Sequence, residues 1–199
     1  MAITNGYATL SDVKAALRIT DAVDDSLLEI AVESASRLID GFTFRTFTNA
    51  GTAVRSFVAS DAYNVIIDDL ISLSLLETTD ELDQPYDTWS ATDYQLTPVN
   101  GRIDGLVVPY NALLAVGDKT FYTVGQQALV KVTGVWGWSA IPIAVKQATI
   151  IQAIRIYKRP DSPLGVAGFG DLGAIRVGRA LDPDVEMLVN PYRIMRNFS

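Results

Sequence analysis

The sequence predicts an α+β fold, in which an N-terminal helix pair and C-terminal helices form a helical core with an antiparallel β-rich region inserted between them. Three observations lead to this prediction. Residues 1–42 show helical spacing of apolar side chains, residues 43–138 are short β-branched and aromatic runs separated by turn residues, and residues 139–199 return to helical spacing. We treat residues 1–199 as a single domain built from these three parts.

The first part is expected to begin with a short helix. Thr9 and Asp12 have the spacing of a capping box, in which each residue satisfies a backbone N–H group at the start of the helix. A small apolar face follows, made by Val13, Ala16 and Leu17.

A second helix is expected after the acidic turn at residues 21–25. Ser26 and Glu29 again show the spacing of a capping box, and Gly41 is placed to end the helix. Its apolar stripe consists of Leu27, Leu28, Ala31, Ala35, Leu38 and Ile39.

The middle part is expected to be a set of short strands. We predict strands near residues 53–59, 64–67, 72–78, 94–97, 106–108, 119–124 and 128–135. Turn residues lie at 49–51, 84–85, 100–101 and 125–126. The last two strands are predicted to form a hairpin around Gly125.

The third part begins with an unusual helix at residues 142–158. Pro142 suits the first helical turn and Pro160 ends the pattern. Ile143, Ile150, Ile154 and Tyr157 form one apolar stripe, and a second stripe on another side contains Val145, Ala148 and Ile156. Since a surface helix shows a single apolar stripe, this helix either lies at the centre of the monomer core or is covered on one side by another subunit.

Residues 159–178 are predicted to form a long loop, because they contain five glycines and two prolines. Loops of this length in folded domains usually have a function or lack order. Asp182 and Pro183 then provide the N-cap and first-turn proline of a short final helix that ends before Pro191.

Cysteine and histidine are both absent from the chain. Most zinc sites, Cys and Ser–His nucleophiles and imidazole acid–base catalysis require one of these residues. We therefore predict no enzyme, with no catalytic residues, metal or cofactor. The absence of cysteine is compatible with a reducing compartment.

Charge is distributed unevenly along the chain. Residues 1–145 carry eight basic and eighteen acidic side chains, a net charge of −10, whereas residues 146–199 carry eight basic and five acidic side chains, a net charge of +3. An acidic protein does not hold a phosphate backbone through bulk charge, because that requires lysine and arginine to displace counterions. The asymmetry either fits the two parts for different partners or has no functional meaning. The sequence shows no secretory signal and no membrane-spanning run, so no membrane partner is expected.

Three motifs invite a chemical interpretation and are interpreted as structural instead. Gly168, Gly170 and Gly173 match a dinucleotide fingerprint, but a helix and a loop precede them where the fingerprint needs a strand. The acidic groups at 68–69, 80–83 and 182–186 lack the spacing of a calcium loop and are interpreted as turns and a helix cap. Trp136 and Trp138 could stack on bases, yet no basic stripe lies beside them, so we predict that they pack in the core.

Several runs resemble the head–tail connector proteins of tailed phages, also called head-to-tail adaptor, head-completion or neck proteins. Residues 10–18, with the acidic turn and the second helix, are similar to the opening of that family. In the second half, the resemblance is carried by residues 130–138, 141–148, 156–165, 168–173 and 181–193.

The resemblance implies a structural virion protein located in the neck, at the portal vertex, and assembled in the host cytoplasm. Such proteins form an oligomeric ring, expected to be a dodecamer, that binds the portal protein and docks a stopper or tail protein. Duplex DNA would pass through the ring without specific binding. We expect the subunit or portal contacts at Val145, Ala148, Ile151, Tyr157, Lys158, Arg159, Gly165, Gly168, Phe169, Gly170, Gly173, Arg193 and Arg196.

Three alternatives remain open at this stage. Within a virion neck, the chain could be a stopper or tail-terminator protein. Outside virions, the β-rich part could be a carbohydrate- or peptide-binding module that uses Trp136 and Trp138. A small enzyme would require two acidic side chains that meet in a cleft.

Overall fold

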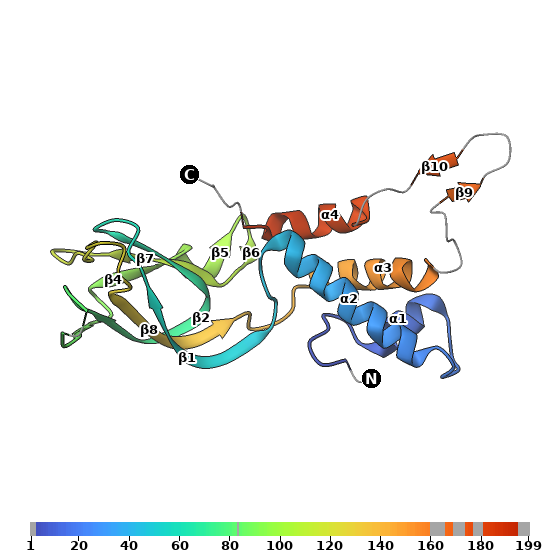
Figure 1. Cartoon of the computed structure of the whole chain (residues 1–199), viewed down its shortest axis with the longest axis horizontal. Helices are drawn as coiled ribbons and strands as arrows, with labels where there is room; N and C mark the ends of the chain where they lie inside the picture. Colours follow the sequence, from blue (N-terminus) through green and yellow to red (C-terminus); the bar gives the residue numbers. More distant parts are fainter. Residues whose placement is uncertain (1–2, 83, 160–165, 169–173, 177–180, 195–199) are drawn as a thin grey trace. The chain divides into compact units, whose positions relative to one another are not determined.

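The helices and the large sheet belong to two different units of the chain. The computed structural model describes residues 3–82, 84–159, 166–168, 174–176 and 181–194. The helical unit comprises Met1–Phe47 and Ile141–Ser199, and the sheet unit comprises Thr48–Ala140 (Figure 1). The predicted α+β class, with an antiparallel β region in the middle of the chain, is confirmed.

Helix α1 (Leu10–Leu17) begins with the predicted capping box. The Asp12 backbone N–H donates to Thr9 Oγ1 over 3.1 Å, and the Thr9 N–H donates to Asp12 Oδ2 over 2.9 Å. At the other end, Arg18 adopts a left-handed conformation and its N–H donates to the Ala15 and Lys14 carbonyls. Both ends of this short helix are therefore fixed by local hydrogen bonds.

Helix α2 (Asp25–Thr43) begins earlier and ends later than predicted. The expected capping box of Ser26 and Glu29 is wrong, because Asp24 is the N-cap residue and both predicted residues already lie inside the helix. The predicted end at Gly41 is also wrong. The helix continues for two more residues to Thr43, which is completely buried. The Thr43 hydroxyl donates to the Ile39 carbonyl over 2.8 Å.

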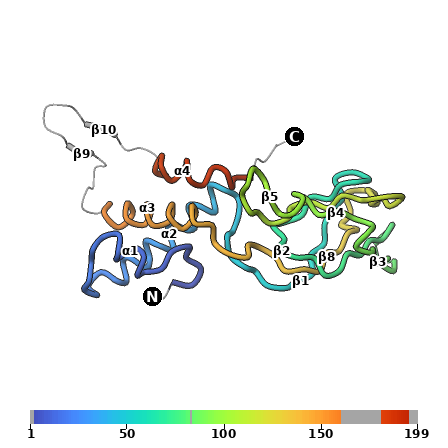
Figure 2. Tube along the Cα trace, turned by 180° about the vertical axis from the view of Figure 1, so that it is seen from behind, coloured from blue at the N-terminus to red at the C-terminus, as the bar shows by residue number. Residues whose placement is uncertain are grey.

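Helix α3 (Ile143–Lys158) is the central helix of its unit. It packs against α1, α2 and α4 (Pro183–Val189), and both views show α1 and α4 on opposite sides of it (Figures 1 and 2). Its buried residues are Val145, Ala148, Thr149, Gln152 and Ala153. Within one chain, α3 therefore fits the first of the two predicted alternatives, the centre of the monomer core.

The last helix, α4, begins with the predicted N-cap residue and first-turn proline. Asp182 caps α4, its side chain accepts the Asp184 N–H over 3.0 Å, and Pro183 occupies the first turn. The 3-10 helix η3 (Asn190–Tyr192) follows directly. Upstream, β9 (Val166–Gly168) and β10 (Ala174–Arg176) form an antiparallel pair within the segment predicted to be entirely loop.

The sheet unit contains a six-stranded antiparallel sheet. Its strand order is β1-β8-β2-β7-β4, with β3 paired to β2. These strands are β1 (Asn49–Phe57), β2 (Asn64–Thr78), β3 (Asp87–Trp89), β4 (Tyr94–Thr97), β7 (Tyr110–Ala115) and β8 (Val130–Gly137). A separate small hairpin joins β5 (Arg102–Ile103) to β6 (Leu106–Val107).

Two predicted strands are one continuous strand in the structure. Residues 64–67 and 72–78 both belong to β2, which pairs with β7 over its first part and with β8 over its second part. The register shifts between Ile66 and Leu70 and again between Leu70 and Ser72. Asp68 and Asp69 lie at this irregularity, so their interpretation as a turn was wrong. A bulge bends a strand without ending it.

The predicted hairpin around Gly125 is wrong. Residues 119–124 form no strand, although Thr, Phe, Tyr and Val suit one. Phe121 is held by tertiary contacts instead, since its N–H donates to the Ala62 carbonyl and its ring stacks on Trp89 at 4.7 Å. The partners of β8 are β1 and β2 instead. A further strand, Tyr110–Ala115, was not predicted because it contains no β-branched residue.

Each unit has its own apolar core. The sheet unit buries Leu70, Leu76, Leu113, Val132 and Trp136 completely. In the helical unit, the core side chains are Val13, Leu28, Ala31, Val32, Ala35 and Ala153. Of the helices that the structure describes, none combines the length and apolar character needed to cross a membrane.

Candidate interaction surfaces

The predicted contact residues of α3 divide into buried and half-buried positions. Val145 and Ala148 are completely buried inside their own unit, so they hold the monomer together. Ile151 and Tyr157 are half-buried. The Tyr157 hydroxyl donates to Asp24 Oδ2 over 2.6 Å, which ties the last turn of α3 to the beginning of α2.

Exposed basic side chains lie at the end of α3. Lys158 and Arg159 are both exposed, and they are the last two residues described before position 166. One turn earlier, Arg155 Nη1 lies 3.0 Å from Asp182 Oδ2. The Gln152 side chain also accepts the Asp182 N–H over 3.3 Å. The start of α4 is therefore anchored on α3, while the final turn of α3 presents positive charge.

Arg193 is exposed at the end of the described chain. Its guanidinium group lies 4.9 Å from the ring centre of Phe42 and 5.9 Å from that of Phe44. The N–H of Ile194 donates to the Thr43 carbonyl over 2.9 Å. The segment after α4 is thus docked on the end of α2. Gly168 ends β9, whereas Gly165, Phe169, Gly170, Gly173 and Arg196 lie outside the described residues.

A polar and aromatic cluster around Tyr7 joins three distant segments, and the sequence did not reveal it. The buried Tyr7 hydroxyl donates to Asp40 Oδ1 and accepts the Phe47 N–H over 2.9 Å. The Phe47 ring meets Tyr7 edge-on at 5.5 Å and Tyr192 edge-on at 5.8 Å. These contacts connect the N-terminal segment, the end of α2 and the C-terminal segment, so the cluster serves the fold.

Burial also alters the acidity of this cluster. Desolvation raises the pKa of the Asp40 carboxyl group above its ordinary value, against the opposing effects of the Tyr7 hydrogen bond and the charge of Arg37. Desolvation raises the pKa of the Tyr7 hydroxyl group as well. The Arg37 guanidinium lies 3.0 Å from Asp40, so the carboxylate has a cation beside it.

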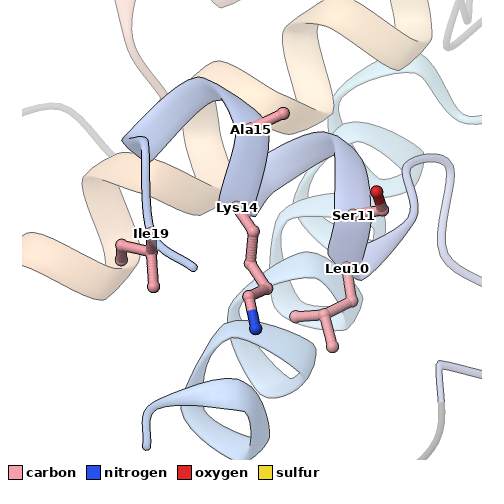
Figure 3. A pocket seen from close by; sticks show the side chains of 5 residues that line it. All are labelled: Leu10, Ser11, Lys14, Ala15 and Ile19. Carbon is pink, nitrogen blue, oxygen red and sulfur yellow. The ribbon is translucent and has the colours of Figure 1, made fainter. Parts of the chain in front are cut away.

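A shallow depression of about 430 Å³ lies on α1 and on Ile19, which comes after the C-cap of that helix (Figure 3). It is lined by Leu10, Ser11, Lys14, Ala15 and Ile19. Lys14 extends between Leu10 and Ile19, and its ammonium group contacts Asp25 Oδ1 at 2.5 Å and the Asp21 carbonyl at 2.6 Å. Because the Lys14 ammonium group is already neutralised within the chain, the depression provides little electrostatic attraction for an anionic ligand.

The two neighbouring tryptophans are structural, as predicted. Trp136 is completely buried and its indole N–H donates to the Ala53 carbonyl over 2.8 Å. Trp138 is 4% exposed and its indole N–H donates to Asp69 over 2.8 Å. Between them, Gly137 has a positive φ of 95°, and a Cβ atom there would lie 2.0 Å from the Thr48 carbonyl oxygen. Neither indole is placed to stack on a base or a sugar.

The acidic pair at 68–69 is also used by the fold. Asp68 Oδ2 lies 2.7 Å from Arg55 Nη1, and the Arg55 guanidinium covers the Trp136 ring at 4.5 Å. Asp69 accepts the Trp138 indole N–H. Within the described residues, no three His, Cys, Asp or Glu side chains are grouped so that they could hold a metal ion.

Residues 7–73 match the family model described as phage gp6-like head-tail connector protein. The resemblance to the phage head–tail connector family is confirmed. The matched segment contains the Tyr7 cluster's first residue, the capping box of α1, all of α2 and β1, and most of β2.

Two solved structures share the fold of the whole chain. One similar chain comes from "Neck of empty GTA particle computed with C6 symmetry", with 17% identity and a TM-score of 0.56. Another comes from "Virion of native gene transfer agent (GTA) particle", with 18% identity and a TM-score of 0.54. Each match covers 100% of this chain and 95% of the other. No curated protein matches this connector-like chain.

Proposed function

We propose that the chain is a structural protein of a virion neck, and that it forms a ring beneath the portal which prolongs the DNA channel and docks a stopper or tail protein. The observation that supports this most is the full-length fold likeness to a chain of a gene transfer agent neck, together with the connector match over residues 7–73. The ring we propose has twelve subunits. The protein would act through its surfaces rather than through catalysis.

The charge of the chain supports a channel that DNA traverses without being held. The net charge is −7, and the segment 1–145 has a net charge of −10. Such a surface repels the phosphate backbone, and the affinity that comes from counterion release is then missing. Translocating DNA would therefore slide past the ring.

The C-terminal segment is the part we propose for the portal. Residues 146–199 have a net charge of +3. Lys158, Arg159, Arg193 and Arg196 would meet acidic groups on the portal, and the glycine-rich segment 165–178 would reach the portal or a neighbouring subunit. Charge complementarity of this kind steers association and selects the partner.

Light scattering over a concentration series, with negative-stain images of the same samples, tests the ring. Closed rings with a hole wide enough for duplex DNA are the expected result. The same measurement is made with the cognate portal protein present. A chain that stays monomeric and does not bind the portal would contradict the proposal.

Co-purification with the portal tests the assignment of the C-terminal segment. Deletion of residues 182–199 would also remove the core residues Val185 and Val189, so its effect on folding would be mixed with its effect on binding. Removal of residues 195–199 keeps both helical core residues and eliminates Arg196. We expect this truncation combined with Arg193→Glu to weaken portal binding, and unchanged binding would contradict the assignment.

A further inference from the structure

One side of α3 is not covered by the other described helices. The buried residues Val145, Thr149 and Gln152 follow one another at intervals of three or four, so they lie on one side of the helix. The opposite side carries Ile143, Gln147, Ile151 and Lys158, whose spacing also places them on one side of the helix. We call this set the α3 open face.

The α3 open face presents two isoleucines and is basic at its end. Ile143 is 85% exposed, Gln147 and Lys158 are exposed, and Ile151 is half-buried. The nearby Ile154 packs against the core of the helical unit and is not part of this face. Arg159 follows directly and is exposed. Exposed isoleucines on a helix face are typical of a surface that packs against a partner.

A second apolar surface lies on the outer side of α2. Val23, in the turn before the helix, is 83% exposed, while Leu27 and Ile30 are 56% and 48% exposed. The core residues Leu28 and Val32 point to the other side of the helix, toward the core shared with α1 and α3. We call Val23, Leu27 and Ile30 the α2 outer face.

The segments that contain the two faces differ in charge, although some of these charges are paired within one chain, namely Lys146 with Asp12, Arg155 with Asp182 and Lys14 with Asp25. Residues 141–159, which include α3, contain four basic and no acidic side chains. Residues 9–30, which include the turn before α2, contain two basic and five acidic side chains. Asp21 is exposed in that turn. The acidic corner of the α2 outer face is therefore complementary to Lys158 and Arg159 at the end of the α3 open face.

We propose that the α2 outer face of one copy of this chain binds the α3 open face of the next copy. Leu27 and Ile30 would pack on Ile151, and Asp21 would lie near Lys158 and Arg159. This assignment rests on the proposed ring and names the surfaces that build it.

The positions of the two faces suit a ring. The α2 outer face lies on a different side of α2 from Leu28 and Val32, and the α3 open face lies on a different side of α3 from Val145, Thr149 and Gln152. The two faces are therefore different surfaces on two different helices. A contact between two different surfaces of identical subunits is head-to-tail, and it closes into a ring when the rotation between subunits allows it.

Cross-linking through single cysteines tests this contact, and the natural chain contains no cysteine that would interfere. We would prepare the full-length variants Leu27→Cys and Ile151→Cys, mix them in equal amounts and add a short bis-maleimide. A covalent dimer is expected in the mixture and in neither variant alone. The double variant is expected to give a ladder of larger products. Ser11→Cys, at an exposed position on α1, mixed with Ile151→Cys is the matched control and should give no dimer.

The outcomes separate this contact from the ring itself. If light scattering shows oligomers but the Leu27→Cys and Ile151→Cys mixture gives no dimer, the ring remains and the assigned faces are wrong. A dimer of Leu27→Cys alone would show that the α2 outer face pairs with itself, which also overturns the assignment. A chain that neither associates nor cross-links, with or without the portal, overturns both proposals.

Charge reversal provides an independent readout of the same contact. Lys158→Glu combined with Arg159→Glu should lower the yield of the cross-linked dimer several-fold. Asp21→Lys in the Leu27→Cys partner should restore that yield, because the charges are again opposite. An unchanged yield in the first variant would contradict the predicted orientation of the two faces.

Discussion

At the residue scale, Tyr7 shows how much of this fold depends on a few polar contacts. Its hydroxyl donates to Asp40 and accepts the backbone N–H of Phe47. Phe47 is completely buried in the core. The sequence could not reveal this role, because Tyr7 and Asp40 are 33 positions apart and neither belongs to a recognisable motif. Only the folded chain brings them together.

We predict that Tyr7→Phe lowers the free energy of unfolding of the helical unit by about 1–3 kcal/mol, the usual penalty for leaving a buried donor without an acceptor. The ring and its contact with Phe47 would be kept, so the loss would report the hydroxyl alone. Urea unfolding followed by circular dichroism measures the change. Tyr63→Phe, at a side chain that is 59% exposed, is the control. A loss no larger than that of the control would contradict the role of Tyr7.

Asp40 gives the same cluster a pH dependence with a defined sign. Burial raises its pKa in the folded state above the unfolded value, so the folded state binds more protons in the window between these two values. The contribution of Asp40 to stability is therefore present below the unfolded pKa and is lost as the pH rises through the folded pKa. When unfolding free energies are measured from about pH 3 upward, across the ordinary Asp pKa, the stability of the wild type relative to Asp40→Asn should therefore decrease as the pH rises. Parallel profiles would contradict this assignment.

At the element scale, local signals predicted the ends of some helices and missed others. The capping box of α1 and the N-cap of α4 are formed entirely by neighbouring residues, so spacing alone located them. The limits of α2 depend on distant contacts. Its N-cap residue Asp24 accepts a hydrogen bond from the Tyr157 hydroxyl, and the helix extends beyond Gly41 to Thr43, which is buried. The same reason explains why residues 119–124 form no strand although their composition favours one.

The contact surfaces were predictable only in part, for a related reason. The helical spacing of α3 located two apolar sides, but it could not tell which side α1, α2 and α4 would cover. Val145 and Ala148 were therefore expected in the core or in a subunit contact, and they lie in the core. The pattern on α2 did not separate Leu27, which is exposed, from Leu28, which is buried.

The capping box of α1 allows a prediction at the same scale. Thr9→Ala should lower the free energy of unfolding by about 1 kcal/mol, because it removes the acceptor for the Asp12 N–H. It should also raise the pKa of Asp12, which is lowered to about 2 chiefly by the Thr9 hydroxyl hydrogen bond and further by the Thr9 backbone N–H and by Lys146. The stability that Asp12 adds is present above its unfolded pKa and is lost as the pH falls toward 2.

Thr9→Ser keeps the hydroxyl and is the control for that variant. Chemical denaturation at neutral and acidic pH measures both effects. The difference between Thr9→Ala and Thr9→Ser should be large near neutral pH and should shrink in acid, as Asp12 becomes protonated. A difference that does not depend on pH would mean that Asp12 takes no part in the cap.

At the scale of the whole molecule, the chain has two cores, and the distribution of its tryptophans makes them separately observable. Trp89, Trp136 and Trp138 all lie in the sheet unit, whereas the described α-helices all lie in the helical unit. Tryptophan fluorescence therefore follows the unfolding of the sheet unit, and the helical band of circular dichroism follows mainly the other unit. Two transitions that do not coincide would show that the chain departs from two-state behaviour.

We predict that Leu28→Ala destabilises the helical unit by about 2–5 kcal/mol, since it removes a completely buried side chain and leaves a cavity. The helical transition should move to lower denaturant concentration, while the tryptophan transition should stay in place, because each unit buries its own set of side chains. Leu113→Ala, in the core of the sheet unit, should have the reverse effect. Leu27→Ala, at the neighbouring exposed position, controls for the loss of a leucine from α2. If Leu28→Ala shifted both transitions equally, the two cores would unfold as one, and a neck subunit of this kind would have to assemble from a single cooperative body.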